Sequence, residues 1–294
     1  MNRIVNLLYY INKYFGWVLT YKSWNKLLFR INSFRRGGQY YNLSIDDPKT
    51  FNEKILFLKR QKSTTNHVLV ADKFKVRQYV SKLIGEEFLI PLLWVSSSIQ
   101  DFEMDVIPNN CVVKLNNGSG YNFIIKNDLS KIKFKNIKRI LANSFKKDFS
   151  KFSKELHYKY IKPRILIEKL IDYPLNDYKF FCSNGKPFMI QVDIDRFTKH
   201  KRNFYNLSWE KQELVLNYDN YSGIINQPKN LDMMIEISKK LSNDFNFCRV
   251  DLYVSNNNIY FGEITLFPGG GVELFKTYKM DLEMGNLIQL LNDA

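Results

Sequence analysis

Two carboxylates and an arginine near the end of the chain have the types and spacing of a metal and phosphate site. They lie in the segment RVDLYVSNNNIYFGEITLFPGGG, which spans residues 249–271. Its apolar residues alternate along two short runs around a polar turn, which predicts two adjacent strands. Asp251 and Glu263 would then lie side by side, with Thr265 on the same face as Glu263. Mg²⁺ takes oxygen ligands together with waters and substrate phosphates, so this set can hold it against a nucleotide triphosphate.

The same segment also fits a simpler structure, a hairpin whose charged residues face water. Three glycines follow Pro268. They favour the ligand-binding interpretation, because a glycine backbone can approach a ligand closely.

A second candidate is a lysine at the end of a predicted strand. Lys114 precedes a loop that contains Gly118, Ser119 and Gly120. Backbone N–H groups of such a loop can cover phosphate oxygens while the lysine supplies a point charge. The spacing fits neither a Walker A loop nor a dinucleotide fingerprint, and an ordinary hairpin is the alternative.

Charged residues at the ends of two further strands are candidates for ligand contact. Glu168 and Lys169 end an apolar strand, which suits a purine because a purine needs hydrogen-bonding edges and apolar walls; a strand emerging into solvent explains them equally well. Cationic residues near a later hairpin can hold phosphate or a carboxylate substrate. This charged cluster consists of Asp177, Lys179, Asp193, Asp195, Arg196, Lys199, His200, Lys201 and Arg202.

The histidines give no sign of nucleophilic catalysis. His200 has no Ser or Cys near it in a nucleophile setting, so a catalytic triad is not predicted. His67 and His157 have no visible partners in the sequence and are predicted to lie at the surface.

The elements that must position these residues follow an α+β order. Asn184 and Gly185 separate two of the predicted strands and give a strong hairpin signal. No repeat or low-complexity linker divides the chain. The predicted helices are 51–60, 71–83, 136–149 and 231–242, and the predicted strands are 88–95, 111–115, 121–126, 164–170, 177–183, 187–193, 250–254 and 259–264.

Composition indicates a globular protein with room for a large core. The chain has 294 residues, of which 45% are hydrophobic, and this excludes a disordered protein. Cys111, Cys182 and Cys248 are odd in number and far apart, so we expect buried thiols in a reducing compartment, without a disulfide framework or a zinc site.

The net charge of +15 is concentrated in two regions. Residues 1–45 hold seven Lys or Arg and no acid, and residues 131–162 hold eleven against Asp148 and Glu155. Such a surface attracts nucleic acid, anionic lipid or an acidic substrate, and charge alone does not choose among them. The first region is predicted to be an amphipathic helix that packs on the protein or lies on a membrane surface, because polar residues interrupt it too soon for a membrane span.

Ordered blocks along the chain resemble one family. From about Pro48 onward the sequence resembles the ATP-grasp superfamily, and in particular the TupA-like branch that is associated with teichuronopeptide and other surface polysaccharides. The blocks that carry the resemblance are TFNEKILFLK, ADKFKVRQYV, IGEEFLIPLLWV, VVKLNNGSG, DYKFFCSNGKP, QVDIDRFTKHKRNFY, RVDLY and FGEIT.

The resemblance implies an α+β ATP-grasp fold in which ATP is held between two α+β subdomains. The implied parts are a basic helical N-terminal region (1–47), an N-terminal α/β subdomain (48–107), a lid subdomain with the glycine loop (108–172) and a C-terminal subdomain with the metal site (173–294).

Roles for individual residues follow from the same resemblance, by similarity to ATP-grasp enzymes of the D-alanine ligase type. Lys73 and Lys114 look like the phosphate-binding lysines, Gly118, Ser119 and Gly120 like the loop that closes on ATP, Glu168, Lys169 and Ile171 like the adenine hinge, and Asp177 like a ribose contact. Asp251 and Glu263 look like the Mg²⁺ ligands, and Arg249 like the arginine that steadies the oxyanion. Thr265 stands where the family usually has Asn.

The implied reaction joins a carboxylate of an acidic sugar or polysaccharide to an amine, with ATP and Mg²⁺ as cofactors and no nucleic acid partner. Arg196, Lys199, Arg202, Gly269 and Gly270 are expected to contact the acceptor. A cytoplasmic location is expected, with peripheral membrane contact through the N-terminal region as an option. The alternatives are a glycosyltransferase, for which Asp193-Ile-Asp195 is the one weak motif, and a non-catalytic nucleotide- or glycan-binding module.

Overall fold

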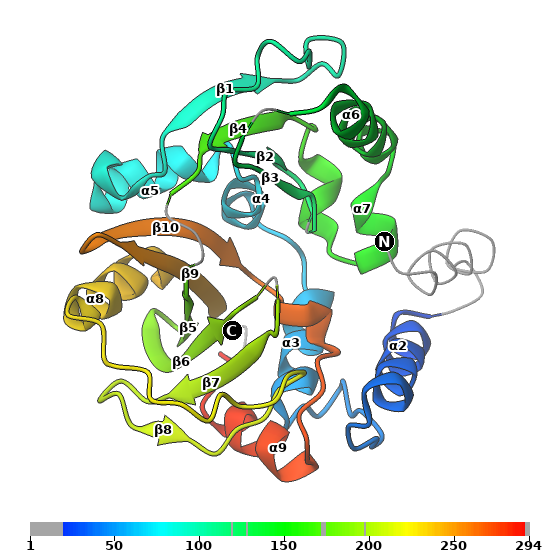
Figure 1. Cartoon of the computed structure of the whole chain (residues 1–294). Coiled ribbons are helices and arrows are strands. Elements are labelled where there is room, and N and C mark those ends of the chain that lie inside the picture. Colours follow the sequence, from blue (N-terminus) through cyan, green and yellow to red (C-terminus); the bar gives the residue numbers. More distant parts are fainter. Residues whose placement is uncertain (1–19, 119, 128, 172–174, 197, 292–294) are drawn as a thin grey trace.

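The chain folds around two antiparallel sheets, one above the other in Figure 1. The computed structural model describes residues 20–118, 120–127, 129–171, 175–196 and 198–291. The helices are α2 (Tyr21–Arg36), α3 (Phe51–Arg60), α4 (Thr65–Ala71), α5 (Val76–Ile84), α6 (Lys131–Phe145), α7 (Phe149–Ser153), α8 (Leu231–Ser242) and α9 (Tyr278–Asn286), with 3₁₀ turns η1 (Glu86–Phe88), η2 (Leu156–Tyr160) and η3 (Pro268–Gly271).

The upper sheet has four strands in the order β1-β4-β2-β3. Its inner face packs against α6, whose Ile137 and Leu141 are buried in the same core as Val113 and Ile167. Because side chains alternate along a strand, Lys114 lies on the opposite face of β2. The strands are β1 (Leu92–Ser96), β2 (Cys111–Leu115), β3 (Asn122–Ile125) and β4 (Ile165–Lys169).

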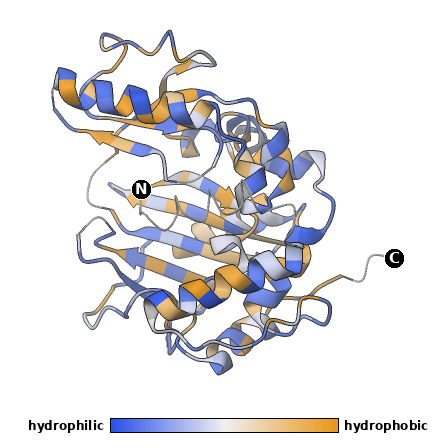
Figure 2. Cartoon of the chain, turned by 90° about the vertical axis from the view of Figure 1, so that its right-hand side faces the viewer, coloured by the Kyte–Doolittle hydropathy of each residue, from blue (hydrophilic) through white to orange (hydrophobic). Residues whose placement is uncertain are grey.

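The lower sheet has six strands in the order β10-β9-β5-β6-β7-β8. Figure 2 shows bands of contrasting hydropathy along strands of both sheets. Along β5, in the middle of the lower sheet, successive side chains point to opposite faces. Cys182 faces α8, with its Sγ 4.0 Å from the Ser238 carbonyl, whereas Phe181 packs against Phe51 of α3. The strands are β5 (Asp177–Ser183), β6 (Lys186–Ile194), β7 (Lys201–Tyr205), β8 (Lys211–Gln212), β9 (Phe247–Ser255) and β10 (Asn258–Thr265).

Residues 48–107, predicted to form one subdomain, contribute to both halves of the molecule. Strand β1 pairs with β4 of the upper sheet, and α3 packs into the core of the lower sheet. The subdomain boundaries at residues 48, 108 and 173 stay a prediction. The three cysteines are free and buried, as expected.

Two helices begin at residues other than the predicted ones. The helix predicted at 71–83 starts only at Val76, because Asp72 Oδ1 accepts the N–H groups of Phe74 (2.9 Å) and Lys75 (3.3 Å) and so forms a turn. The helix predicted at 136–149 begins at Lys131, capped by the Ser130 hydroxyl, and ends at Phe145.

The prediction that His157 lies at the surface is wrong. Its side chain is 1% exposed and packs between the rings of Tyr158 and Phe267. Burial lowers its pKa to about 3, so it is neutral at physiological pH.

The N-terminal part of the described chain is helix α2, which packs on the lower half of the molecule. Trp24 and Phe29 are buried, and Phe29 shares a small core with Leu56 and Leu274. The amphipathic pattern predicted within residues 1–19 lies outside the described residues. In the part of the chain described here, no helix combines the length and apolar character needed to cross a bilayer.

A buried carboxylate joins α9 to the start of α3. Asp281 accepts hydrogen bonds from the Asn52 backbone N–H (3.0 Å) and side-chain amide (2.5 Å), and from the Tyr41 hydroxyl. Burial raises its pKa to about 6, although these hydrogen bonds oppose the shift. The carboxyl group is therefore easier to protonate in the folded chain than in the unfolded one.

This gives a pH-dependent stability. An aspartate has a pKa of roughly 3.9 when unfolded, so the folded state binds more protons between about pH 4 and pH 6, and stability falls as pH rises through this window, by about 3 kcal/mol. We expect Asp281→Asn to remove that part of the slope in urea unfolding measured from pH 4 to 7. The same slope in both proteins would contradict this assignment.

Candidate functional site

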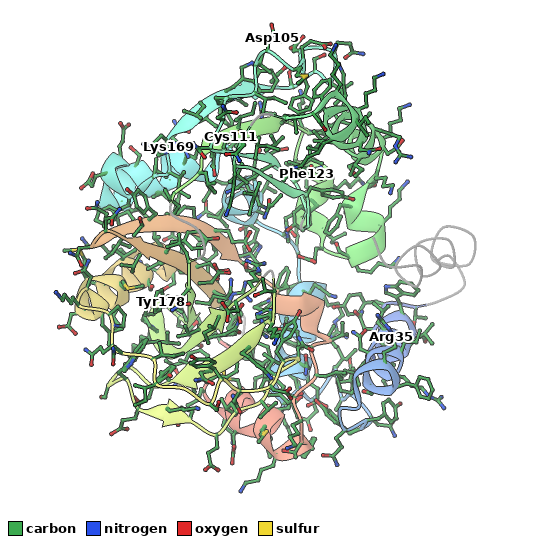
Figure 3. All side chains as sticks on the ribbon, viewed as in Figure 1. Arg35, Asp105, Cys111, Phe123, Lys169 and Tyr178 are labelled. Atoms are coloured by element: carbon green, nitrogen blue, oxygen red, sulfur yellow. The ribbon has the colours of Figure 1, made fainter. Side chains whose placement is uncertain are left out.

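A pocket lies where the two sheets meet. Its apolar walls come mainly from the upper sheet and the connection to the lower one, and Asp177 and Tyr253 of the lower sheet close it. Figure 3 labels Lys169 beside Cys111 in the upper sheet, above Tyr178 of the lower sheet. The lining residues are Ile90, Val112, Lys114, Asn122, Ile124, Glu168, Lys169, Leu170, Ile171, Leu175, Asp177, Arg196 and Tyr253.

The polar centre of this first pocket is a lysine–glutamate pair. The Lys114 Nζ lies 2.6 Å from Glu168 Oε2, and Arg77 lies 3.5 Å from Glu168 Oε1. Val112 pairs with Glu168 in the sheet register, so both residues and Lys114 occupy the face turned away from α6. The pocket therefore combines apolar walls with a buried acceptor and a cation.

The predicted glycine loop is tied to the lower sheet by Lys73. Its ammonium donates to the Gly118 carbonyl at 2.9 Å and lies 3.6 Å from Glu263 Oε2. Gly118 and Gly120 have φ of +75° and +84°, which side-chain-bearing residues rarely adopt. Ser119 lies outside the described residues.

The predicted metal ligands are neighbours on β9 and β10. Glu263 pairs with Asp251 in the register of the hairpin. Arg249 donates to both Asp251 oxygens, at 2.7 and 2.8 Å, and Lys179 lies 2.7 Å from Oδ2. The Thr265 hydroxyl lies 3.4 Å from Glu263 Oε1 and 3.3 Å from the Arg249 guanidinium.

The electrostatics keep Glu263 ionised. Burial alone would raise the pKa of its carboxyl group, but nearby Lys73, Lys179 and Arg249 outweigh burial and lower the pKa to about 2. Conversely, Asp251 and Glu263 raise the pKa of the Arg249 guanidinium against the effect of its own burial.

The donor set fits Mg²⁺ that is completed by a nucleotide. Among the described residues, no group of three or more His, Cys, Asp or Glu side chains could hold a metal by itself. Asp251, Glu263 and Thr265 offer hard oxygen atoms, and Mg²⁺ ordinarily takes its remaining ligands from phosphates and water. The surrounding cations suit triphosphate oxygens.

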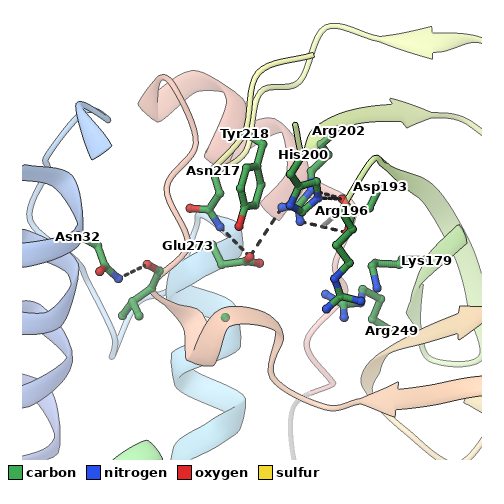
Figure 4. A pocket seen from close by; sticks show the side chains of 12 residues that line it. Asn32, Lys179, Asp193, Arg196, His200, Arg202, Asn217, Tyr218, Arg249 and Glu273 are labelled. Atoms are coloured by element: carbon green, nitrogen blue, oxygen red, sulfur yellow. Dashed lines mark hydrogen bonds and ion pairs between the residues drawn. The ribbon is translucent and has the colours of Figure 1, made fainter. Parts of the chain in front are cut away.

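A second, larger pocket lies further along the same face of β5 and β9, beside the glycine turn η3 (Figure 4). It has a volume of about 440 Å³, within the range of small-molecule sites. Most of its charged lining groups are cationic. The lining residues are Asn32, Lys179, Asp193, Arg196, His200, Arg202, Asn217, Tyr218, Arg249, Gly269, Val272 and Glu273.

Hydrogen bonds fix the floor of this second pocket. The Arg202 Nε lies 2.6 Å from Asp193 Oδ1, and His200 lies 3.2 Å from the same oxygen. Asn217 donates to Glu273 Oε1 at 2.8 Å. Burial opposes ionisation of Asp193, but its contacts with His200 and Arg202 and the nearby Lys179 outweigh burial and lower its pKa. Asp193 is thus held by contacts within the protein.

The two pockets meet at Arg196, which lines both. Its guanidinium lies 2.6 Å from Asp177, and Lys179 bridges Asp177 (3.3 Å) and Asp251 (2.7 Å). A row of paired charged side chains therefore connects the first pocket, the metal-ligand candidates and the second pocket. We call this row the charged track; it consists of Arg196, Asp177, Lys179 and Asp251.

The predicted acceptor contacts are only partly brought together. Arg196, Arg202 and Gly269 line the second pocket, whereas Lys199 is exposed and lines neither pocket. Gly270 turns its carbonyl to the Lys59 ammonium at 2.6 Å.

Lys179 was predicted only as a member of the charged cluster, without a role of its own, and Glu273, which also lines the second pocket, was not predicted as a site residue. For Lys179 a signal existed, because it lies two residues after Asp177 and so shares its face of β5.

Comparison with known proteins identifies a family for the chain. The family model described as "TupA-like ATPgrasp" matches residues 53–289. A comparison with curated proteins gave no match.

Similar solved structures include D-alanine–D-alanine ligase from Bacillus anthracis (15% identity, TM-score 0.44, covering 75% of this chain and 67% of that one). The D-alanine–D-alanine ligase from Helicobacter pylori gives 17% identity, TM-score 0.39, and coverage of 76% and 62%. The ATP-grasp ligase PsnB complexed with minimal precursor, Mg and ADP gives 9% identity, TM-score 0.36, and coverage of 73% and 57%. The match thus spans less than two thirds of the length of the last two.

The family match covers most of the chain, and it includes both sheets and every described residue of the two-carboxylate site. The chain therefore belongs to the TupA-like ATP-grasp family.

Proposed function

We propose that the protein is a carboxylate–amine ligase that forms an amide on an acidic sugar of a bacterial surface polysaccharide or its precursor. The observation that carries this proposal is the contact between the two pockets. The apolar first pocket suits a purine, the second suits an anionic acceptor, and the charged track lies where phosphates would join them.

In the proposed reaction, the γ-phosphoryl group of ATP moves to a carboxylate oxygen of the acceptor, and ADP leaves. The amine nitrogen then attacks the acyl carbon, inorganic phosphate leaves, and the nitrogen loses a proton as the amide forms. When bound, Mg²⁺ would neutralise charge on the transferred phosphoryl group.

The chain's own residues supply positioning and charge. Lys73 and Lys114 would hold phosphate oxygens, and the Lys73 contact with Gly118 would keep the glycine loop over them. Arg249 is oriented by two hydrogen bonds to Asp251, and its remaining donors would stabilise an oxyanion.

The second pocket supports an acidic acceptor. Lys179, Arg196, Arg202 and Arg249 line it, and its two lining carboxylates, Asp193 and Glu273, are both engaged by protein donors. A carboxylate entering this pocket would meet guanidinium groups, which favour carboxylates as ligands.

The proposal is tested by product analysis. With a uronic acid and a mixture of amines, we expect release of ADP and phosphate that depends on the uronic acid, and no UDP release from sugar nucleotides. Asp251→Ala and Glu263→Ala should abolish ADP formation. ADP formation that survives both substitutions, or UDP release in place of ADP, would reject the ligase mechanism.

Thr265 allows a test of the metal site in which a substitution is expected to strengthen Mg²⁺ binding. Asparagine is the usual residue at this position in the family that the sequence resembles, and its amide oxygen reaches further from the backbone than a threonine hydroxyl does. We expect Thr265→Asn to lower the Mg²⁺ concentration that gives half-maximal ADP formation several-fold, with Thr265→Val as the control that raises it. Identical Mg²⁺ titrations for all three proteins would show that residue 265 is not a ligand.

We also propose peripheral membrane contact through the N-terminal region. On α2, Lys22, Lys26, Arg30 and Phe34 recur every four residues and are exposed, with Phe34 93% exposed. A basic, partly apolar stripe of this kind binds anionic bilayers. We expect the full chain, but not a chain lacking residues 1–45, to co-sediment with anionic liposomes. Equal sedimentation would reject the contact.

A further inference from the structure

A third pocket has no role in the reaction described above. It lies on the far side of the glycine turn η3 from the second pocket, which we now call the acceptor pocket. It has a volume of about 380 Å³ and lies between α2 and α3 on one side and α7 and η2 on the other. We call it the basic cleft. Its lining residues are Tyr21, Lys59, Arg60, Asp148, Ser150, Lys151, Lys154, Leu156 and Lys159, that is, five cationic side chains and one carboxylate.

The cations of the basic cleft differ in their partners among the described residues. Arg60 lies 2.7 Å from Asp46, and Lys151 lies 4.0 Å from Asp148. Lys154 and Lys159, in contrast, form no ion pair with any residue that the structure describes. Burial also lowers the pKa of Lys154, so its ammonium is partly stripped of water without a carboxylate to compensate.

The backbone of Lys154 is strained. It closes α7 with φ of +58° in the left-handed region, where glycine or asparagine is usual. A side chain at such a position costs stability, and strain of this kind gathers at functional sites. Glycine would end α7 more favourably but would leave the cleft without this ammonium.

Lys59 connects the basic cleft to the acceptor pocket. It is buried, with 3% exposure, and donates to the Gly270 carbonyl (2.6 Å) and to Asn25 Oδ1 (3.0 Å). Gly269, the preceding residue of the same turn, lines the acceptor pocket. The two pockets thus lie on either side of one turn, η3.

We infer that the basic cleft is an anion-binding subsite that holds a second acidic group of an extended saccharide acceptor, while the first acidic group occupies the acceptor pocket. Leu156 and the ring of Tyr21 supply the apolar surface against which a sugar ring packs, and Lys154 and Lys159 pair with its carboxylate or phosphate. The acceptor is then a chain of at least several sugars and not a monosaccharide. This inference rests on the proposed function for the identity of the first group.

Binding of defined oligosaccharides tests it. With the nucleotide pocket saturated by a non-hydrolysable ATP analogue and Mg²⁺, calorimetry would compare galacturonic acid with tetragalacturonic acid, and glycerol phosphate with a glycerol phosphate tetramer. We expect one tetramer to bind at least tenfold more tightly than its monomer, and the arm that responds identifies carboxylate or phosphate as the recognised group. Equal affinities in both arms would overturn the inference.

Substitutions then locate the effect. Lys154→Gly removes the ammonium and relieves the strained backbone, so we expect an unchanged or higher melting temperature together with loss of the tetramer's advantage. Lys159→Gln should weaken the tetramer in the same way, whereas Lys131→Gln, an equal charge change on the exposed start of α6, should not. Tetramer binding that is unaffected by Lys154→Gly and Lys159→Gln would place the subsite elsewhere and reject the assignment.

Turnover separates this inference from the proposed function. ADP release with a monomeric uronic acid should be unchanged in Lys154→Gly, because the basic cleft is not part of the ATP or acceptor pocket. If the wild type shows no acceptor-dependent ADP release at all, the ligase proposal fails, whereas normal ADP release with no preference for the longer acceptor rejects the subsite alone.

Discussion

Glu263→Gln is expected to reduce the rate of ADP formation at saturating ATP by roughly 100- to 1,000-fold, the range seen when one transition-state charge contact is removed. Glutamine keeps the size of the side chain but removes the negative charge that faces Lys73 and Arg249. The Glu263 side chain is 40% exposed, so the fold should survive the change. The measurement is single-turnover ADP formation, with circular dichroism to confirm folding.

Two features sharpen this experiment. Glu283→Gln on α9 is a matched control, because that carboxylate is also about half exposed and, among the described residues, pairs only with Lys279 at 3.7 Å. Because the pKa of Glu263 is about 2, its ionisation should not limit activity anywhere above about pH 4. A Glu263→Gln enzyme with near-normal turnover would remove this residue from the metal site.

Lys179→Met is expected to cause the largest loss of stability, about 3 kcal/mol in the free energy of unfolding. The Lys179 side chain is 4% exposed, and its ammonium lies 3.3 Å from Asp177 and 2.7 Å from Asp251. Removing one member of a buried charge group leaves the others uncompensated, which costs roughly 3–5 kcal/mol. Arg196 and Arg249 still pair with the two carboxylates, so we place the loss at the lower end.

Urea unfolding measures this effect, with a lower midpoint and an unchanged slope as the expected result. Lys186→Met provides the control, since it is the same substitution at an exposed strand position. In addition, Lys179→Met combined with Asp251→Asn should lose less than the sum of the two single changes, because the pair is removed together. Equal losses in Lys179→Met and Lys186→Met would show that the buried contacts contribute nothing.

Local sequence signals predicted the hairpins well. Alternation and a polar turn predicted the pairing of Asp251 with Glu263, and β9 and β10 confirm it. Likewise, Asn184 and Gly185 form the turn between β5 and β6 with φ of +49° and +74°, values that these two residue types tolerate. In both cases the information lies within about ten residues of chain.

Local sequence signals could not predict which residues form the floor of the acceptor pocket. Glu273 is fixed by Asn217, 56 residues away, and that contact depends on how the β7–β8 region returns to η3. Helix starts failed for a related reason: the Asp72 turn competes with a helical first turn, and its carboxylate also accepts from the Asn116 amide (2.9 Å) of the glycine loop. A contact distant in sequence fixes Glu273, and another, with Asn116, holds the Asp72 carboxylate that forms the turn.

Arg196 has a wider consequence, because a single guanidinium lines both ligand pockets and pairs with Asp177 at 2.6 Å. An anionic ligand in either pocket changes the electric field and the freedom of this side chain in the other. By thermodynamic linkage, whatever ATP does to the affinity for the acceptor, the acceptor does equally to the affinity for ATP. The two substrates are therefore expected to bind cooperatively, with Arg196 as the residue through which their binding free energies are shared.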